Sequence, residues 1–114
     1  MKYVFVQLLA FSAKARKLRL TLDDLREIEN DITAHPTRWP LVAGTNGLRK
    51  MRFALAASGS GKSGGLRVCY FIIDALGRVY LVTLFAKNEK DNLTKAEAND
   101  IAALIAGIKS LHKT

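Results

Sequence analysis

The chain has 114 residues, of which 49% are hydrophobic, and its formal net charge is +8 at pH 7. This length is typical of one domain, so we expect a single domain over residues 1–114. The one cysteine excludes an internal disulfide and favours a cytoplasmic setting, and no run approaches the roughly 20 apolar residues of a membrane span. The positive charge favours a polyanionic partner, such as nucleic acid, an acidic protein or an anionic membrane surface.

The N-terminal part of the sequence predicts a strand followed by two helices. Residues 2–7 alternate as a strand does, and residues 10–19 form a short basic helix. The cations of this helix are Lys14, Arg16, Lys17 and Arg19. Because they follow the apolar start at once, we do not interpret that start as an export signal. Thr21 is the expected N-cap of the second helix, which the pair His35–Pro36 ends. Its expected apolar stripe consists of Leu22, Leu25, Ile28 and Ile32.

The remaining sequence predicts strands and then a closing helix. A short strand is expected at residues 41–43, and three longer strands at 48–57, 66–74 and 78–86. A glycine-rich loop joins the first two long strands, and a tight hairpin turn at 75–77 joins the last two. Thr94 and Glu97 form the pattern of a capping box for a helix at 95–112. Segregated helices and hairpin-linked strands define the α+β class, with the first two helices on one sheet face.

The strand expected at 48–57 has two chemically different faces. Met51, Phe53 and Leu55 share one face, and Lys50 and Arg52 share the other, because side chains alternate along a strand. The cationic face must meet water or a ligand, since an unpaired buried charge is costly. A compact meander would bring these two cations toward the basic residues at the ends of the next strands, namely Arg67, Lys87 and Lys90. The pattern leaves open the alternative that strand-end charges only solubilise the sheet and blunt its edges.

The histidines, the cysteine and the remaining aromatic residues do not indicate a second catalytic or metal-binding site. His35 and His112 have no partners at metal-binding or catalytic spacing, so we expect neither a metal nor a cofactor. Cys69 lies in an apolar run and is interpreted as a buried structural thiol. Trp39 is expected to cover an edge of the core, and Tyr70 and Tyr80 are expected to be core or sheet-edge aromatics.

Three segments together resemble the RelE/ParE superfamily of bacterial type II toxins, and within it the HigB-like branch. They are GTNGLRKMR at 44–52, GSGKSGGLRVCY at 59–70 and YLVTLFAKNEKDNLT at 80–94. The opening strand and helices also match in order. The resemblance implies a RelE-like fold, in which an N-terminal strand and two helices pack on a mainly antiparallel twisted sheet with a C-terminal helix. It further implies a ribosome-dependent mRNA endonuclease that uses the RNA 2′-hydroxyl, needs no metal, and is neutralised by a helix-turn-helix antitoxin encoded nearby.

The resemblance also implies roles for the cations. Lys50, Arg52 and Arg67 fall where the family carries basic active-site residues, and the stretch from Lys87 to Lys90 falls where relatives carry another. We expect these five residues to be catalytic, with Arg67 holding the scissile phosphate. The remaining expected RNA contacts are Lys14, Arg16, Lys17, Arg19, Arg49, Lys62 and Asn88.

Two departures from the family pattern keep other functions open. Asn88 stands where relatives have a basic residue, and Thr94 stands near the place of a tyrosine found in some members. One alternative is a DNA gyrase inhibitor of the ParE type, which would have the same fold with a different target. The other is a non-catalytic RNA-binding protein derived from such a toxin.

Overall fold

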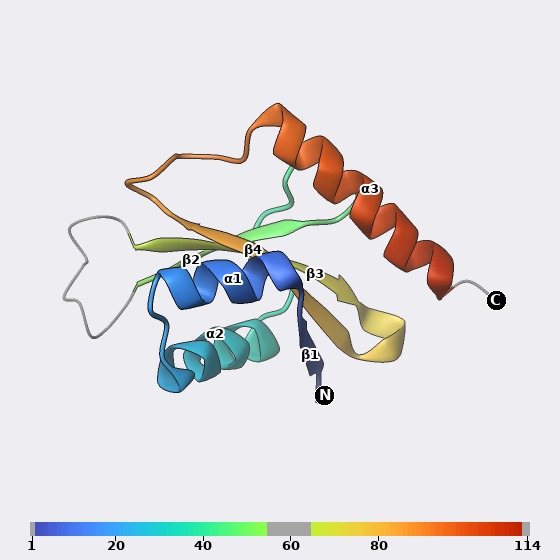
Figure 1. The fold of residues 1–114 in the computed structure, drawn as a ribbon. Helices are drawn as coiled ribbons and strands as arrows, with labels where there is room; N and C mark the ends of the chain where they lie inside the picture. Colours follow the sequence, from blue (N-terminus) through green and yellow to red (C-terminus); the bar gives the residue numbers. More distant parts are fainter. Residues whose placement is uncertain (1, 55–64, 113–114) are drawn as a thin grey trace.

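The structure, a computed structural model, describes residues 2–54 and 65–112. Within these residues the chain forms three α-helices and a four-stranded sheet, arranged as in Figure 1, so the α+β class expected from the sequence is confirmed. The elements are β1 (Val4–Gln7), α1 (Leu9–Lys17), α2 (Leu22–Ala34), β2 (Arg49–Phe53), β3 (Leu66–Ile73), β4 (Arg78–Ala86) and α3 (Lys95–Leu111), with a 3-10 turn at Asp74–Leu76 between β3 and β4.

The sheet is mixed, with the strand order β1-β4-β3-β2. β2 and β3 pair antiparallel, as do β3 and β4, whereas β1 runs parallel to β4 at one edge. β1 can reach that parallel position because α1, α2 and two further strands separate it from β4 in the chain. The expected mainly antiparallel sheet is therefore confirmed.

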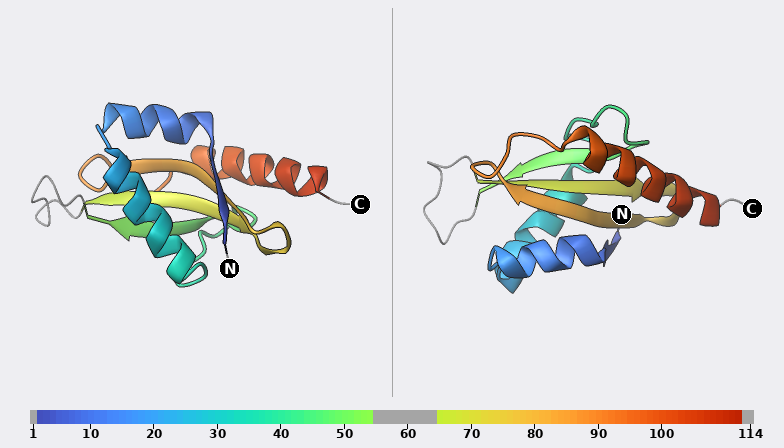
Figure 2. Two further views of the ribbon diagram at one scale, coloured as in Figure 1. Left: turned by 90° about the horizontal axis from the view of Figure 1, so that it is seen from below. Right: turned by 45° about the horizontal axis from the view of Figure 1, so that its top comes forward.

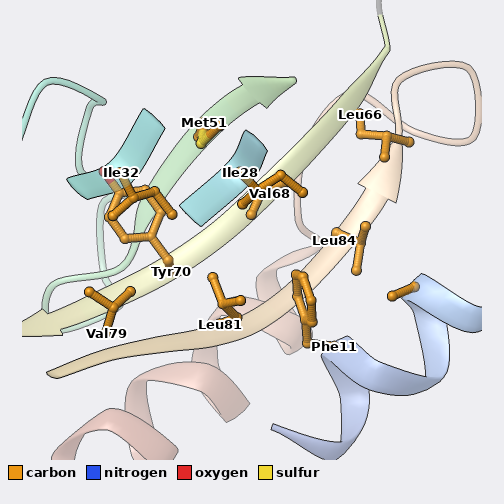
Figure 3. Packing of buried hydrophobic residues seen from close by; sticks show 11 residues of the cluster. Phe11, Ile28, Ile32, Met51, Leu66, Val68, Tyr70, Val79, Leu81 and Leu84 are labelled. Atoms are coloured by element: carbon orange, nitrogen blue, oxygen red, sulfur yellow. The ribbon is translucent and has the colours of Figure 1, made fainter. Parts of the chain in front are cut away.

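Helices cover both faces of the sheet, as the right-hand view of Figure 2 shows, with α1 and α2 on one side and α3 on the other. The expectation that the first two helices share one face is confirmed. On that face Phe11 and Ala15 of α1 and Ile28 and Ile32 of α2 are buried against the strands. Figure 3 shows the sheet residues that they meet, among them Tyr70 and Leu81.

A second core lies on the opposite face of the sheet, under α3. Ile101 and Ile105 of the helix pack with the buried side chains of Leu48, Cys69 and Phe71. The other buried members of this core are Tyr80, Val82 and Phe85. Cys69, Tyr70 and Tyr80 are thus buried, as the sequence predicts.

A β-bulge in β4 shifts the alternation of its side chains. Cys69 pairs with Thr83 and the next residue, Tyr70, pairs with Leu81, so β4 holds one extra residue at this point. As a result Leu81 and Leu84 both face α1, although three positions separate them. Phe85 consequently lies on the α3 face, which matters for the site below.

Capping boxes begin α2 and α3. The Thr21 hydroxyl accepts from the Asp24 N–H at 3.0 Å while the Asp24 carboxylate accepts from the Thr21 N–H at 2.9 Å. Thr94 and Glu97 make the same pair of bonds at α3. His35 is the C-cap of α2, as expected. These ends are therefore set by local residues that the sequence identifies.

The structure corrects several expected details. Leu22 is 73% exposed and lies outside the apolar stripe, because the capping box turns Asp24 inward in its place. Residues 41–43 contribute a single bridge, from Leu41 to Arg49, and no strand. β2 ends at Phe53 within the described residues, and Leu55 lies outside them. The first helix ends at Lys17, with Arg19 beyond it.

Candidate functional site

Two arginines lie directly opposite each other on the α3 face of the sheet. The register of β2 and β3 pairs Arg52 with Arg67, and that of β3 and β4 pairs Arg67 with Phe85. Side chains opposite each other in a sheet share a face, with Cβ atoms about 5 Å apart. The three side chains therefore form one row across β2, β3 and β4.

The neighbouring row of the same face contains Lys50, which pairs with Cys69. It lies about 7 Å from the first row, since two residues of a strand separate the rows. The Lys50 ammonium donates to the side-chain oxygen of Asn92, in the connection that leads from β4 to α3. Lys50 is thus held by a neutral partner above the buried thiol of Cys69.

A fourth cation reaches this face from the turn after β4. The Lys90 ammonium lies 5.2 Å from the centre of the Phe85 ring and donates to Glu97 Oε2 at 2.6 Å. Because Phe85 is the neighbour of Arg67 in the first row, Lys90 stands above the end of that row. We call Lys50, Arg52, Arg67 and Lys90 the basic cluster.

Gly65 allows β2 and β3 to approach each other closely at a point next to the basic cluster. Gly65 has a φ of +65°, and a Cβ atom there would collide with the carbonyl oxygen of Phe53. Its own carbonyl accepts from the Lys87 N–H at 3.0 Å, which ties the turn after β4 to the start of β3. Gly65 therefore helps to place Arg67, two residues further on.

The turn after β4 joins helices from both faces of the sheet. Glu89 accepts from Lys14 of α1 at 3.2 Å, while Lys90 reaches Glu97 of α3. Lys87 pairs within the turn with Asp91 at 3.6 Å, and Asn88 is exposed in the same turn. Lys87 and Asn88 thus border the basic cluster.

Arg49 lies on the other side of the sheet from Lys50 and Arg52. It pairs with Tyr70, whose ring belongs to the α1 and α2 core, and its guanidinium donates to the carbonyls of Thr37 and Trp39. The structure does not bring Arg49 together with the basic cluster, because adjacent strand residues point to opposite faces. Its contacts instead hold the loop in which Trp39 covers the core, as the sequence predicts.

The cations of α1 form a separate group. Arg16, Lys17 and Arg19 are exposed at the C-terminal end of the helix, on the α1 side of the molecule. Only Lys14 of this group reaches the turn after β4, through Glu89. Lys62, the remaining expected RNA contact, lies outside the described residues.

Asn92 and Glu97 are site residues that the sequence reasoning did not assign. Glu97 was recognised only as a helix cap, and nothing in the spacing of Asn92 pointed to Lys50. Both contacts depend on how the turn after β4 folds back over the sheet. The only available signal was that both residues flank a stretch already expected to be functional.

Two titratable side chains beside the basic cluster, Glu97 and Cys69, differ in whether they are ionised at neutral pH. The hydrogen bond from Lys90 lowers the pKa of Glu97 below its usual value, so this carboxylate is ionised at neutral pH. Burial raises the pKa of the Cys69 thiol to about 12, which keeps it protonated and excludes it as a nucleophile. The site therefore offers the cations of the basic cluster and the carboxylate of Glu97 beside them, with no activated thiol.

Other features of the described residues supply little chemistry. A groove of about 510 Å³ between α1, β4 and α3 is lined mostly by apolar side chains such as Leu9, Leu93 and Leu104. Within residues 2–54 and 65–112 there is no group of three or more His, Cys, Asp or Glu residues that could hold a metal. No helix in this same part of the chain is long and apolar enough to cross a membrane.

Comparison with known proteins identifies the fold. No protein-family model matches the sequence. Among solved structures, the chain is similar to the toxin RelE of E. coli, in a variant with two arginines replaced by alanine and in the free state. The TM-score is 0.59 and the sequence identity 16%, and the match covers 92% of this chain and 98% of that chain. The expected RelE-like fold is thereby confirmed.

Proposed function

We propose that this protein, which has the RelE fold, is the toxin of a type II toxin–antitoxin system and cleaves messenger RNA on the ribosome. The observation that carries the proposal is the row of Arg52 and Arg67 on one sheet face, with Lys50 and Lys90 beside it. Such a patch of cations on one face of the sheet is suited to one phosphodiester of a polyanion.

The reaction that fits these groups uses a nucleophile of the RNA itself. The 2′-oxygen forms a bond to the adjacent phosphorus, and the bond from phosphorus to the 5′-oxygen breaks. A base takes the proton of the 2′-hydroxyl, and an acid returns a proton to the leaving 5′-oxygen. The protein must supply in-line geometry, proton transfer and positive charge near the transition state, and the basic cluster can supply all three.

Arg67 is the proposed phosphate holder. It lies in the middle of its row, between Arg52 and Phe85, and it is half-buried while Arg52 is exposed. A guanidinium donates two parallel hydrogen bonds to phosphate oxygens, which a lysine cannot do. Arg52 and Lys50 stabilise the charge that develops on the phosphorane-like transition state.

The two lysines of the basic cluster have partners of different charge. Lys90 pairs with a carboxylate, which holds its ammonium at the end of the Arg67 row, and Lys50 contacts a neutral amide. We therefore assign the proton donor for the 5′-oxygen to Lys90 and the proton acceptor to Lys50. Lys87 and Asn88, at the border of the cluster, orient the RNA, and the cations of α1 contact ribosomal RNA phosphates.

The proposed partners follow from the toxin assignment. They are a helix-turn-helix antitoxin encoded nearby, the ribosome and its bound mRNA, in the cytoplasm. Within the superfamily we place the chain in the HigB-like branch, on the segments at 44–52, 59–70 and 80–94.

Brief induction in cells, with mapping of mRNA 5′ ends, tests the proposed activity. We expect cuts within translated messages for the wild type and none for Arg67→Ala. Arg26→Ala is the matched control, because Arg26 is 74% exposed on α2, away from the basic cluster, and its loss changes the net charge equally. Growth arrest and cleavage should persist in that control.

Circular dichroism of both purified variants checks that they are folded. Full toxicity of a folded Arg67→Ala protein would remove the assignment of Arg67. Intact mRNA together with a DNA damage response would favour a gyrase inhibitor, and RNA binding with no cut sites would favour a non-catalytic protein.

A further inference from the structure

Glu97 is an acidic side chain in contact with a cluster of cations that is expected to bind RNA. We propose that Glu97 is a positioning residue of this site, which holds the Lys90 ammonium above the sheet in the place where it donates its proton. The inference rests on the proposed function, and it assigns to Glu97 a role beyond capping α3.

The two oxygens of Glu97 have different partners. Oε1 accepts from the backbone N–H of Thr94 at 2.8 Å, and Oε2 accepts from Lys90 at 2.6 Å. The first bond belongs to the capping box and fixes the carboxylate relative to α3. The second oxygen is consequently aimed at a defined point, where it receives the lysine.

Lys90 is fixed at several points as well. Its backbone N–H donates to the carbonyl of Ala86, its ammonium lies over the Phe85 ring, and its side chain is only 25% exposed. A lysine on the surface normally samples many rotamers, so this restriction needs a partner that outweighs the lost entropy. A charge-assisted bond to Glu97 is such a partner.

The position of this ion pair relates it to the rest of the basic cluster. Lys50 pairs with Cys69 in the second row and the Lys90 ammonium lies over Phe85 in the first row, so both lysines stand on the same face of the sheet. Like charges gathered on one face repel, and the Glu97 carboxylate offsets that repulsion for Lys90. Without Glu97 we expect the ammonium to move away from Arg67 and toward solvent.

Three explanations of Glu97 predict different results. If it only caps α3, glutamine should replace it, because a glutamine side chain also completes a capping box. If it acts only through its charge, removing it should strengthen RNA binding and should not slow cleavage. If it positions Lys90, cleavage should slow while RNA binding stays equal or becomes tighter.

The test measures single-turnover cleavage of ribosome-bound mRNA, and binding of the same mRNA, for a set of variants of the full chain. For Glu97→Gln we expect a cleavage rate at least about 10-fold lower, because a positioned general acid contributes roughly 10²–10⁴-fold and a displaced one loses part of that, with undiminished RNA binding. Glu97→Asp keeps a carboxylate at a capping position, as Asp24 does in α2, and should recover part of the rate.

Asp100→Asn is the matched control for charge, because Asp100 lies about one turn further along α3 and its loss changes the net charge equally. It should cleave like the wild type. Thr94→Ala is the control for the cap, since it removes the hydroxyl bond to the Glu97 N–H but leaves both carboxylate bonds available. It should unfold at a lower denaturant concentration while the folded protein keeps its cleavage rate.

A double mutant separates positioning of Lys90 from any independent effect. The rate of Lys90→Ala/Glu97→Gln should equal that of Lys90→Ala, because Glu97 acts through the lysine. Additive losses, an unaffected Lys90→Ala, or a Glu97→Gln variant that cleaves like the wild type would each overturn the inference and leave the proposed function standing. A wild-type protein that cuts no RNA would overturn both.

Discussion

Arg19 occupies a backbone conformation that residues with a side chain rarely adopt. Its φ is +59°, at the position where α1 ends. The Leu20 N–H donates to the Ala15 carbonyl at 3.0 Å and the Arg19 N–H to that of Arg16 at 3.1 Å. This is the Schellman arrangement, in which glycine usually stands at the left-handed position. Because an arginine stands there instead, we expect its positive charge to serve a function that offsets the strain of this conformation.

Arg19→Gly should therefore raise the free energy of unfolding by about 0.5–1 kcal/mol, after the greater flexibility of glycine in the unfolded chain is allowed for. Arg19→Ala is the matched control, because it removes the same charge and keeps the strain. Urea denaturation of the two variants measures the difference. If the alanine variant proves as stable as the glycine variant, the left-handed conformation is not a source of strain.

The sheet face of a residue could be predicted from the sequence, but its partners on other strands could not. Alternation along a strand correctly places Lys50 and Arg52 on one face with Met51 on the other. It says nothing of partners across strands, so neither the Arg52–Arg67 pair nor the role of Arg49 in holding a loop could be read from the pattern. Those features depend on strand register and on tertiary packing.

Helix α3 is attached to the sheet by few apolar contacts. Two of its 17 residues, Ile101 and Ile105, are buried. Polar contacts supplement them: the Asn46 amide donates to the Ala102 carbonyl at 2.9 Å, and Lys109 donates to the Asn46 carbonyl at 2.7 Å. Because Glu97 lies on this helix, the attachment of α3 also determines where Lys90 is held.

Asn46→Gly should loosen α3 selectively. Asn46 has a φ of +64°, which glycine adopts without strain, so the substitution removes the amide bond and leaves the turn intact. We expect hydrogen exchange in α3 to quicken by an amount equivalent to about 0.5–1.5 kcal/mol, the usual net value of one hydrogen bond. Equal changes in α3 and in the strands would indicate that the bond stabilises the whole fold and not this helix alone.

The elements themselves were largely predictable, but the strand order and the irregularities of the sheet were not. β4 has the predicted bounds, and both capping threonines are where the sequence places them, because caps and alternation are local properties. The sequence pattern could not indicate that β1 joins β4 as a parallel edge strand or that a bulge at Val82 turns Phe85 toward α3. These features arise only when distant segments pack together.

Within the described part of the molecule, lysines from both sides of the sheet meet at the turn after β4. That turn meets α1 through the Lys14–Glu89 pair and α3 through the Lys90–Glu97 pair, so both helical layers are tied to one short segment. The sequence predicts a polyanionic partner from the net charge of +8 alone. The structure adds that cations from both faces converge on this turn, which suits a phosphate backbone passing across it.

Each of the two cores contains a buried acidic group, the Tyr70 phenol in one and the Cys69 thiol in the other. These two groups make the free energy of unfolding depend on pH in alkaline solution. Burial raises the pKa of Cys69 from its usual 9.0 to about 12, and burial likewise raises that of Tyr70 from 10.0 to about 12. As the pH rises above 9, the unfolded chain releases the thiol proton first and then the phenol proton, while the folded protein keeps both. The free energy of unfolding must therefore fall with rising pH.

For the thiol the expected fall approaches about 1.4 kcal/mol for each pH unit between the two pKa values, and it should fade to nearly nothing about one unit below the lower of them. Urea denaturation between about pH 8 and pH 10.5 measures it, with Cys69→Ala as the comparison. The alanine variant should be less stable throughout, because it leaves a small cavity, but its stability should decline less steeply above pH 9. Parallel curves for the two proteins over this range would mean that the native protein releases the thiol proton as easily as the unfolded chain, which a thiol shielded beneath the basic cluster cannot do.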